Sequence, residues 1–219
     1  LAQNTNHNDP LPENSRVTKG ILPNGLTYYI YPTAVVKDAA SYYIIQNVGS
    51  ILENDDQQGL AHFLEHMAFN GTENFPDKAV LNTLQKHGAV FGNDINAYTS
   101  FDETVYNMDN IPNTPELVDT CLLILRDWSN YLALEDDEID AERGIIKEEW
   151  RTRQSGSMRI FQKSLPVLFN NTAYANRMPI GTMDVVDNFE YKALRDFYHD
   201  WYRTDLQAIA IIGDVEVED

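Results

Sequence analysis

Apolar residues recur along this chain at two different spacings, which predict a mixture of strands and helices. Short apolar or alternating runs between turn residues are typical of strands. We expect strands over residues 26–31, 39–48, 95–99, 104–108 and 206–212. Longer segments whose apolar residues are three or four positions apart are typical of amphipathic helices. We expect helices over residues 59–69, 77–87, 117–128, 136–151, 158–169 and 188–202.

Together these elements predict an α+β fold, in which helices cover a mixed and mostly antiparallel sheet. Strands 95–99 and 104–108 are close in sequence and are expected to pair antiparallel. Residues 1–16 are polar and rich in Pro and Asn, which is typical of a leader or linker. We therefore expect one domain over residues 17–219.

Composition and charge narrow the classes of function. The chain has 219 residues, of which 43% are hydrophobic, so it can bury the core of one large domain or two small ones. Its net charge of -18 would repel phosphate groups and argues against nucleic-acid binding. No apolar run approaches the ~20 residues that a membrane-spanning helix needs, so we expect no membrane span. The single cysteine, Cys121, excludes an internal disulfide.

One turn of the expected helix at 59–69 carries two histidines and a glutamate. His62 and His66 are four residues apart, which places them about 40° from each other around the helix axis, and Glu65 lies within roughly 100° of both. Two imidazoles at this spacing can bind one zinc ion, and three protein ligands plus a water make a catalytic zinc site. The order H-x-x-E-H is the inverzincin signature.

The alternative is an ordinary amphipathic helix in which the histidines are merely polar positions. Most of the other residues in segment 59–69 are apolar, so this helix is expected to be largely buried. Burying two histidines and a glutamate together is costly when they have no partner. A metal ion bound by the neutral imidazoles removes that cost, and we therefore favour the metal site.

A third ligand is expected from the acidic helix at 136–151. Glu142 and Glu149 are seven residues apart, so they lie on one face of this helix, two turns from each other. Glu148 points about 100° away from Glu149. Acidic residues in such a run usually lie on a solvated face. The residues alone leave Glu149 and Glu142 as the two candidates to turn inward.

Three separated segments resemble, in the same order, the catalytic N-terminal domain of the M16 zinc peptidases. This family includes pitrilysin, insulin-degrading enzyme and the β-subunit of the mitochondrial processing peptidase. Residues 62–72 (HFLEHMAFNGT) resemble the zinc helix and its exit, and residues 92–100 (GNDINAYTS) resemble the edge-strand region. Residues 142–149 (ERGIIKEE) resemble the helix that supplies the third ligand, and residues 208–214 resemble the last strand of the domain.

The resemblance implies one Zn²⁺ ion per chain and a role for each matching residue. His62, His66 and Glu149 would bind the metal, and Glu65 would act as the general base. A shift of one residue in this register would exchange Glu149 with Glu148.

Two further roles follow from the same resemblance. Glu142 would support the metal site from outside the ligand set, by orienting a histidine. Asn96 and Ala97 match positions that hold the substrate strand. A peptide bound there by main-chain hydrogen bonds would be extended or unfolded, with little dependence on side-chain identity.

The expected function is that of a zinc-dependent endopeptidase domain. Active members of the family enclose peptides between two halves, so a second M16-like half is expected in the same polypeptide or in a partner chain. This chain would be one domain of a larger enzyme and would cleave poorly in isolation. The alternative is a non-catalytic half that serves as a zinc-binding scaffold or binds substrate. An exported, periplasmic location is expected, with a cytoplasmic or organellar one as the alternative.

Overall fold

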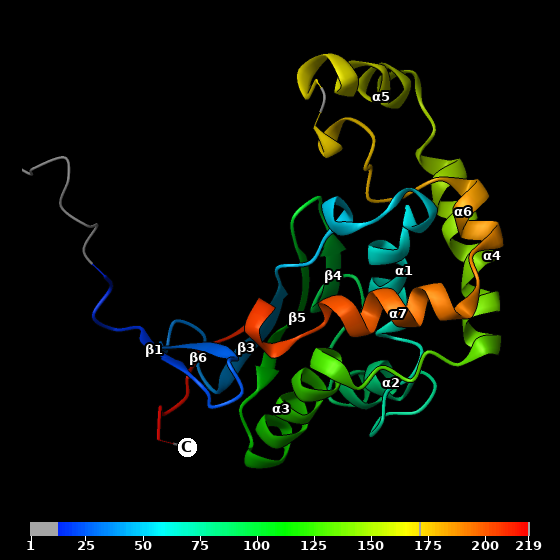
Figure 1. Cartoon of the computed structure of the whole chain (residues 1–219). Helices are drawn as coiled ribbons and strands as arrows, with labels where there is room; N and C mark the ends of the chain where they lie inside the picture. Colours follow the sequence, from blue (N-terminus) through cyan, green and yellow to red (C-terminus); the bar gives the residue numbers. More distant parts are fainter. Residues whose placement is uncertain (1–12, 171, 219) are drawn as a thin grey trace, which may run out of the picture.

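The computed structural model describes residues 13–170 and 172–218, and its centre is a single sheet of six strands (Figure 1). The leader or linker expected at residues 1–16 lies outside the described residues, except for 13–16. The strand order is β1-β2-β6-β3-β5-β4. The strands are β1 (Thr18–Ile21), β2 (Thr27–Pro32), β3 (Ala39–Gln46), β4 (Ile95–Thr99), β5 (Thr104–Pro112) and β6 (Gln207–Gly213).

The sheet is mixed but mostly antiparallel, as the sequence predicts. Only β2 and β6 pair in parallel, whereas the other four neighbouring pairs are antiparallel. The expected pair β4 and β5 is present, with Ile95 opposite Met108. Strand β4 lies at one end of the strand order, so within the described part of the chain one of its edges has no strand beside it.

The α-helices are α1 (Leu60–Met67), α2 (Ala79–Lys86), α3 (Pro115–Asn130), α4 (Asp136–Arg153), α5 (Gly156–Leu168), α6 (Met183–Asn188) and α7 (Tyr191–Trp201). Two of the helices, α1 and α3, pack against strands of the sheet, and α4 and α7 pack against α1, whereas α5 lies apart from the sheet (Figure 1). Short 3-10 helices occur at Ser50–Leu52, Asp55–Gln57, Ala173–Ala175 and Thr204–Leu206. In the described residues, no helix combines the length and apolar character needed to cross a membrane.

Helix α1 is buried on most of its surface and contacts β4, α4 and α7. Leu60, Phe63, Leu64 and Met67 are each at most 1% exposed. Burying an apolar side chain of this size contributes about 1.5 to 3 kcal/mol. The apolar residues of α1 therefore fix the helix between the sheet and α4, where His62 is buried and Glu65 and His66 are half-buried.

One strand and one α-helix were not expected from the sequence, and one expected helix begins later than predicted. Strand β1 has only four residues, and α6 has six. The helix expected at 188–202 begins at Tyr191, because Phe189 and Glu190 are extended, with ψ of 140° and 144°. Thr182 caps α6 by accepting a hydrogen bond from the backbone N–H of Val185.

Candidate active site

The start of α1 is held by a buried carboxyl group that the sequence did not predict. Glu53 is 4% exposed, and its two carboxylate oxygens accept hydrogen bonds from the backbone N–H groups of Gly59 at 3.0 Å and Ala61 at 2.9 Å. Burial raises the pKa of Glu53 to about 8, against the opposing effects of these two donors and of Arg177. An acidic residue six positions before a glycine is too weak a signal to reveal this contact in the sequence.

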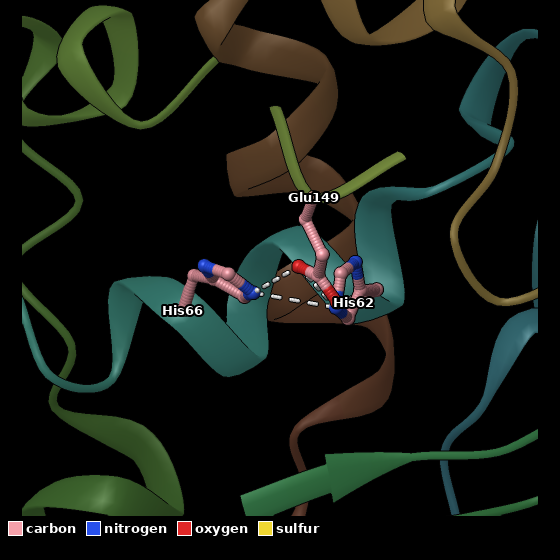
Figure 2. Close-up of side chains that lie close together, drawn as sticks. All are labelled: His62, His66 and Glu149. Atoms are coloured by element: carbon pink, nitrogen blue, oxygen red, sulfur yellow. Dashed lines mark hydrogen bonds and ion pairs between the residues drawn. The ribbon is translucent and has the colours of Figure 1, made fainter. Parts of the chain in front are cut away.

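Three side chains converge between α1 and α4, and Figure 2 shows them pointing at one another. The Nε2 atoms of His62 and His66 are 3.3 Å apart. Oε2 of Glu149 is 3.6 Å from the first nitrogen and 3.3 Å from the second. A zinc ion with bonds of 2.0 to 2.1 Å in tetrahedral geometry separates its ligand atoms by about 3.3 Å. The three atoms are therefore spaced like three corners of a zinc tetrahedron.

The protonation of His62 also suits a metal ligand. Burial, and then the neighbouring His66, lower the pKa of His62 to about 4, so this ring is neutral near pH 7. Its Nδ1 atom is buried and has no hydrogen-bond partner among the described residues. A neutral imidazole is the form that binds zinc. His62 is therefore already in the protonation state that a zinc ligand needs.

His66 has a different environment, because a carboxylate lies on each side of its ring. Nδ1 is 2.7 Å from Oε1 of Glu142, and Nε2 faces Glu149. Burial disfavours the charged ring, but the hydrogen bonds with Glu142 and Glu149 outweigh burial and raise the pKa of His66 to about 9. Glu142 is 5% exposed and lies outside the three converging atoms, on the opposite side of the His66 ring from Glu149.

Helix α4 presents Glu149 to the histidines and turns Glu148 away. The side chain of Glu148 is 58% exposed and pairs with Arg151. Burial opposes ionisation of Glu149, but the hydrogen bond with His66 and the charges around it keep its pKa below the usual value. The second oxygen of Glu149 pairs with Arg153 at 2.5 Å. Of the two neighbouring glutamates, only Glu149 belongs to the converging cluster.

Glu65 projects from α1 toward the edge strand β4. Its Oε2 accepts a hydrogen bond of 2.6 Å from the hydroxyl of Thr99, the last residue of β4. Burial raises the pKa of Glu65, and the bond from Thr99 only partly offsets this rise. A carboxylate of raised pKa beside a metal site is a stronger base than an exposed one.

Asn96 and Ala97 lie on β4, close to the converging side chains. Both are half-buried, and both line a cavity of about 350 Å³ that also reaches Glu65 and His66. The side-chain amide of Asn96 donates to the carbonyl of Asn93 at 3.1 Å. Apolar walls were not expected here from the sequence, and they come from Phe69, Leu81, Phe91 and Ile145.

Comparison with known proteins identifies relatives over almost the whole chain. Residues 30–182 match the family model described as insulinase, peptidase family M16. The probable zinc protease PqqL of Escherichia coli strain K12 is 41% identical over 94% of this chain and 22% of the relative. The probable zinc protease PqqL of Haemophilus influenzae is 36% identical over 96% of this chain and 23% of the relative.

The solved structures that resemble this chain include one of a sequence relative. The crystal structure of the first half of the periplasmic protease PqqL from Escherichia coli superposes with a TM-score of 0.90 and 40% identity, covering 95% of this chain and 44% of that chain. Pitrilysin shares the fold, with a TM-score of 0.79 and 21% identity. The chain spans less than a quarter of the length of the two PqqL sequences. Because the family model covers most of its residues, the chain belongs to the insulinase family of peptidases, family M16.

Proposed function

We propose that this chain is the zinc-binding catalytic domain of an endopeptidase. The observation that carries the proposal is the spacing of three ligand atoms, from His62, His66 and Glu149, at 3.3 to 3.6 Å from one another. Membership of family M16 and the relatives' description as probable zinc proteases support the same reading. One zinc ion would bind there.

The chemistry follows from the residues around that point. A bound zinc ion supplies a Lewis acid, which polarises the scissile carbonyl and makes water acidic enough to attack near neutral pH. Glu65 accepts the proton of the attacking water and returns it to the leaving amine. Thr99 holds the carboxylate of Glu65 in place through their 2.6 Å hydrogen bond. Glu142 keeps the ring of His66 oriented toward the metal.

The substrate is proposed to be a peptide in extended conformation that lies along β4. Strand β4 is at the end of the strand order, and α1 contacts it. A peptide added to this edge would pass Asn96 and Ala97 and reach Glu65. The scissile bond would then lie beside the cluster formed by the two histidines and Glu149.

The chain would act as part of a longer enzyme. It spans 22% and 23% of the two PqqL relatives, which leaves room in them for a second M16-like half. We propose that such a half, in the same polypeptide or a partner chain, closes over the peptide. An exported, periplasmic location is proposed because the relative from Escherichia coli is described as a periplasmic protease.

Two measurements test the proposal. Elemental analysis should find about one zinc per chain, lost on treatment with a chelator and restored when zinc is added. With the second half present, in the longer polypeptide or as a partner chain, hydrolysis of an unstructured fluorogenic peptide should fall by about 10²-fold or more in Glu65→Gln, because the general base is lost while the ligands remain. Glu148→Gln is the matched control and should behave like the wild type, since Glu148 faces solvent.

The outcomes separate the proposed function from its alternatives. A chain that binds no zinc after reconstitution would refute the proposal. Full hydrolysis by Glu65→Gln would show that another group is the base. Zinc binding without hydrolysis, even when the second half is present, would favour a zinc-binding half that does not itself cleave.

A further inference from the structure

A buried asparagine extends the hydrogen-bonded side chains behind the candidate zinc site. Asn70 lies three residues after the end of α1 and is 8% exposed. Its side-chain amide donates a hydrogen bond of 2.6 Å to Oε2 of Glu142. The other oxygen of Glu142 is 2.7 Å from Nδ1 of His66. Asn70, Glu142 and His66 therefore form a continuous chain of hydrogen bonds.

We propose that Asn70 is a positioning residue of the metal centre, which acts on zinc through Glu142 and His66. Its amide fixes the carboxylate of Glu142 so that Oε1 accepts the Nδ1 proton of His66. The Nε2 lone pair of the same ring then points toward His62 and Glu149. The inference rests on the proposed function, because it takes His66 to be a zinc ligand.

The burial of Glu142 explains why a second partner matters. Glu142 is 5% exposed, so an oxygen of its carboxylate that loses its protein partner is costly to leave unpaired. With His66 alone, the carboxylate would be free to rotate about its last bond and offer either oxygen to the ring. The amide of Asn70 occupies one oxygen and leaves the other for the imidazole. An amide also adds no charge of its own beside Glu142 and His66.

The backbone on both sides of Asn70 is fixed by hydrogen bonds to α3. The indole N–H of Trp128 donates to the carbonyl of Ala68 at 2.9 Å, which fixes the exit of α1. Beyond Asn70, the fully buried carboxylate of Asp127 accepts bonds of 2.8 Å from the hydroxyl of Thr72 and the backbone N–H of Asn74. The amide of Asn70 is thus presented to Glu142 from a fixed backbone.

The side chain of Asn70 is not needed to terminate the helix. Asparagine near a helix end commonly bonds to local backbone groups. Here the backbone at the exit is already satisfied, because the N–H groups of Ala68, Phe69 and Asn70 donate to Leu64, His66 and Met67. The amide instead bonds to a carboxylate 72 residues further along the chain. The side chain of Asn70 therefore bonds to a residue of the candidate metal centre and not to the backbone at the exit of α1.

The test measures zinc affinity on the metal-free chain, by competition with a chromophoric chelator. Asn70→Ala should weaken zinc binding by about 3- to 10-fold, less than the loss expected for direct removal of Glu142. Asn70→Asp keeps the shape but not the donor and should lose at least as much. Asn82→Ala is the matched control, because Asn82 is exposed on α2, and it should bind zinc like the wild type.

A double-mutant cycle distinguishes positioning from a general effect on folding. If Asn70 acts through Glu142, adding Asn70→Ala to Glu142→Ala should not weaken zinc binding further. An equal loss in both backgrounds would overturn the proposal. So would wild-type zinc affinity in both Asn70 variants, and in that case the proposed function would stand. A wild-type chain that binds no zinc would refute the proposed function and this inference together.

Discussion

At the scale of single residues, the candidate site depends on which nitrogen of each imidazole faces inward. Both Nε2 atoms point at Glu149, and the Nδ1 atom of His66 is occupied by Glu142. In His62, Nδ1 has no partner in the described part of the chain. The two rings therefore differ in protonation before any metal binds, with pKa values of about 4 and about 9.

Removing the candidate third ligand gives the first prediction at this scale. Glu149→Ala should weaken zinc binding by about 10-fold or more, because a direct ligand is lost. Glu148→Ala, one position away, should leave the affinity unchanged, since its side chain is 58% exposed and pairs with Arg151. Chelator competition measures both. If Glu148→Ala lost zinc and Glu149→Ala did not, the assignment of Glu149 as the third ligand would be wrong.

The raised pKa of His66 predicts how zinc binding depends on pH. Zinc binds the neutral ring, so the extra proton of His66 must leave when the metal enters. Below the pKa of about 9, the apparent affinity should therefore rise with pH, by about 10-fold per pH unit for a single proton, and it should level off above this value. Zinc titrations at pH 6, 7 and 8 check the slope. A constant affinity over this range would contradict the proposed role of His66.

At the scale of elements, the two histidines are positioned because α1 is held at both ends. Its start is bound by the carboxylate of Glu53, and its exit is fixed by Trp128. Two glycines are required near the start of α1. Gly59 has a φ of 107°, which other residues rarely adopt. A Cβ atom on Gly181 would lie 2.3 Å from the carbonyl oxygen of Gln58. The loop before α6 thus contacts the first turn of α1 directly.

The buried carboxyl of Glu53 predicts a pH-dependent contribution to stability. Its pKa is about 8 in the folded chain, against 4.5 for an unperturbed glutamate, so the folded chain binds this proton more tightly. The resulting stability is fully present below pH 4.5 and is lost as the pH rises through 8. Between pH 5 and 8 the wild type should lose stability relative to Glu53→Gln, by on the order of 1 to 4 kcal/mol.

Urea unfolding of the metal-free chain at pH 5 and pH 8 measures this difference. Comparison with Glu53→Gln cancels the titration of all other groups, because glutamine has no proton to lose. Glu116→Gln, at an exposed position on α3, is the control. Its free energy of unfolding should differ from that of the wild type by the same amount at pH 5 and at pH 8. A difference between wild type and Glu53→Gln that stays the same at both pH values would be inconsistent with the raised pKa.

Local patterns in the sequence predicted most of the helices and strands, and the two elements that they missed are short. Apolar spacing located α1, α4 and the pair β4 and β5, because these signals lie within a few residues. Strand β1 has four residues, and α6 has six, so neither repeats its pattern often enough to stand out from its surroundings.

The same limit applies to the candidate site. Four-residue spacing on one helix face brought His62 and His66 together, and a seven-residue spacing left Glu142 and Glu149 as alternatives. The structure gives these two glutamates different surroundings, since only Glu149 reaches both histidines and Glu142 lies behind His66. The partners of Glu142 are 72 and 76 residues away, beyond the reach of any local pattern. The roles of these residues, and of Asn96 and Ala97, remain predictions.

At the scale of the whole molecule, the candidate site joins two helices that are distant in sequence. A metal bound by α1 and α4 would stabilise the folded chain by mass action, by about 4 kcal/mol when free zinc is a thousandfold above its dissociation constant. For a chain of this size, zinc should then raise the melting temperature by roughly 8 to 16 °C relative to the chelated form.

Differential scanning calorimetry with and without chelator measures the shift. Glu149→Ala should show a much smaller shift at the same zinc concentration, because its affinity is reduced. Identical melting temperatures for zinc-loaded and metal-free wild type would contradict a metal that links α1 to α4.

The free edge of β4 has a consequence beyond catalysis. In the described part of the chain, Ile95 at the start of this edge bonds to Val90 and Gly92. The rest of the edge has no strand beside it and offers backbone N–H and C=O groups to any extended chain, including a second copy of the same protein. The net charge of -18 opposes such self-association, because two copies repel each other before their edges can meet. Salt shortens the range of this repulsion, because the screening length falls from about 10 Å at 0.1 M to about 3 Å at 1 M. The acidic surface thus protects an open edge from aggregation, and this protection weakens in concentrated salt.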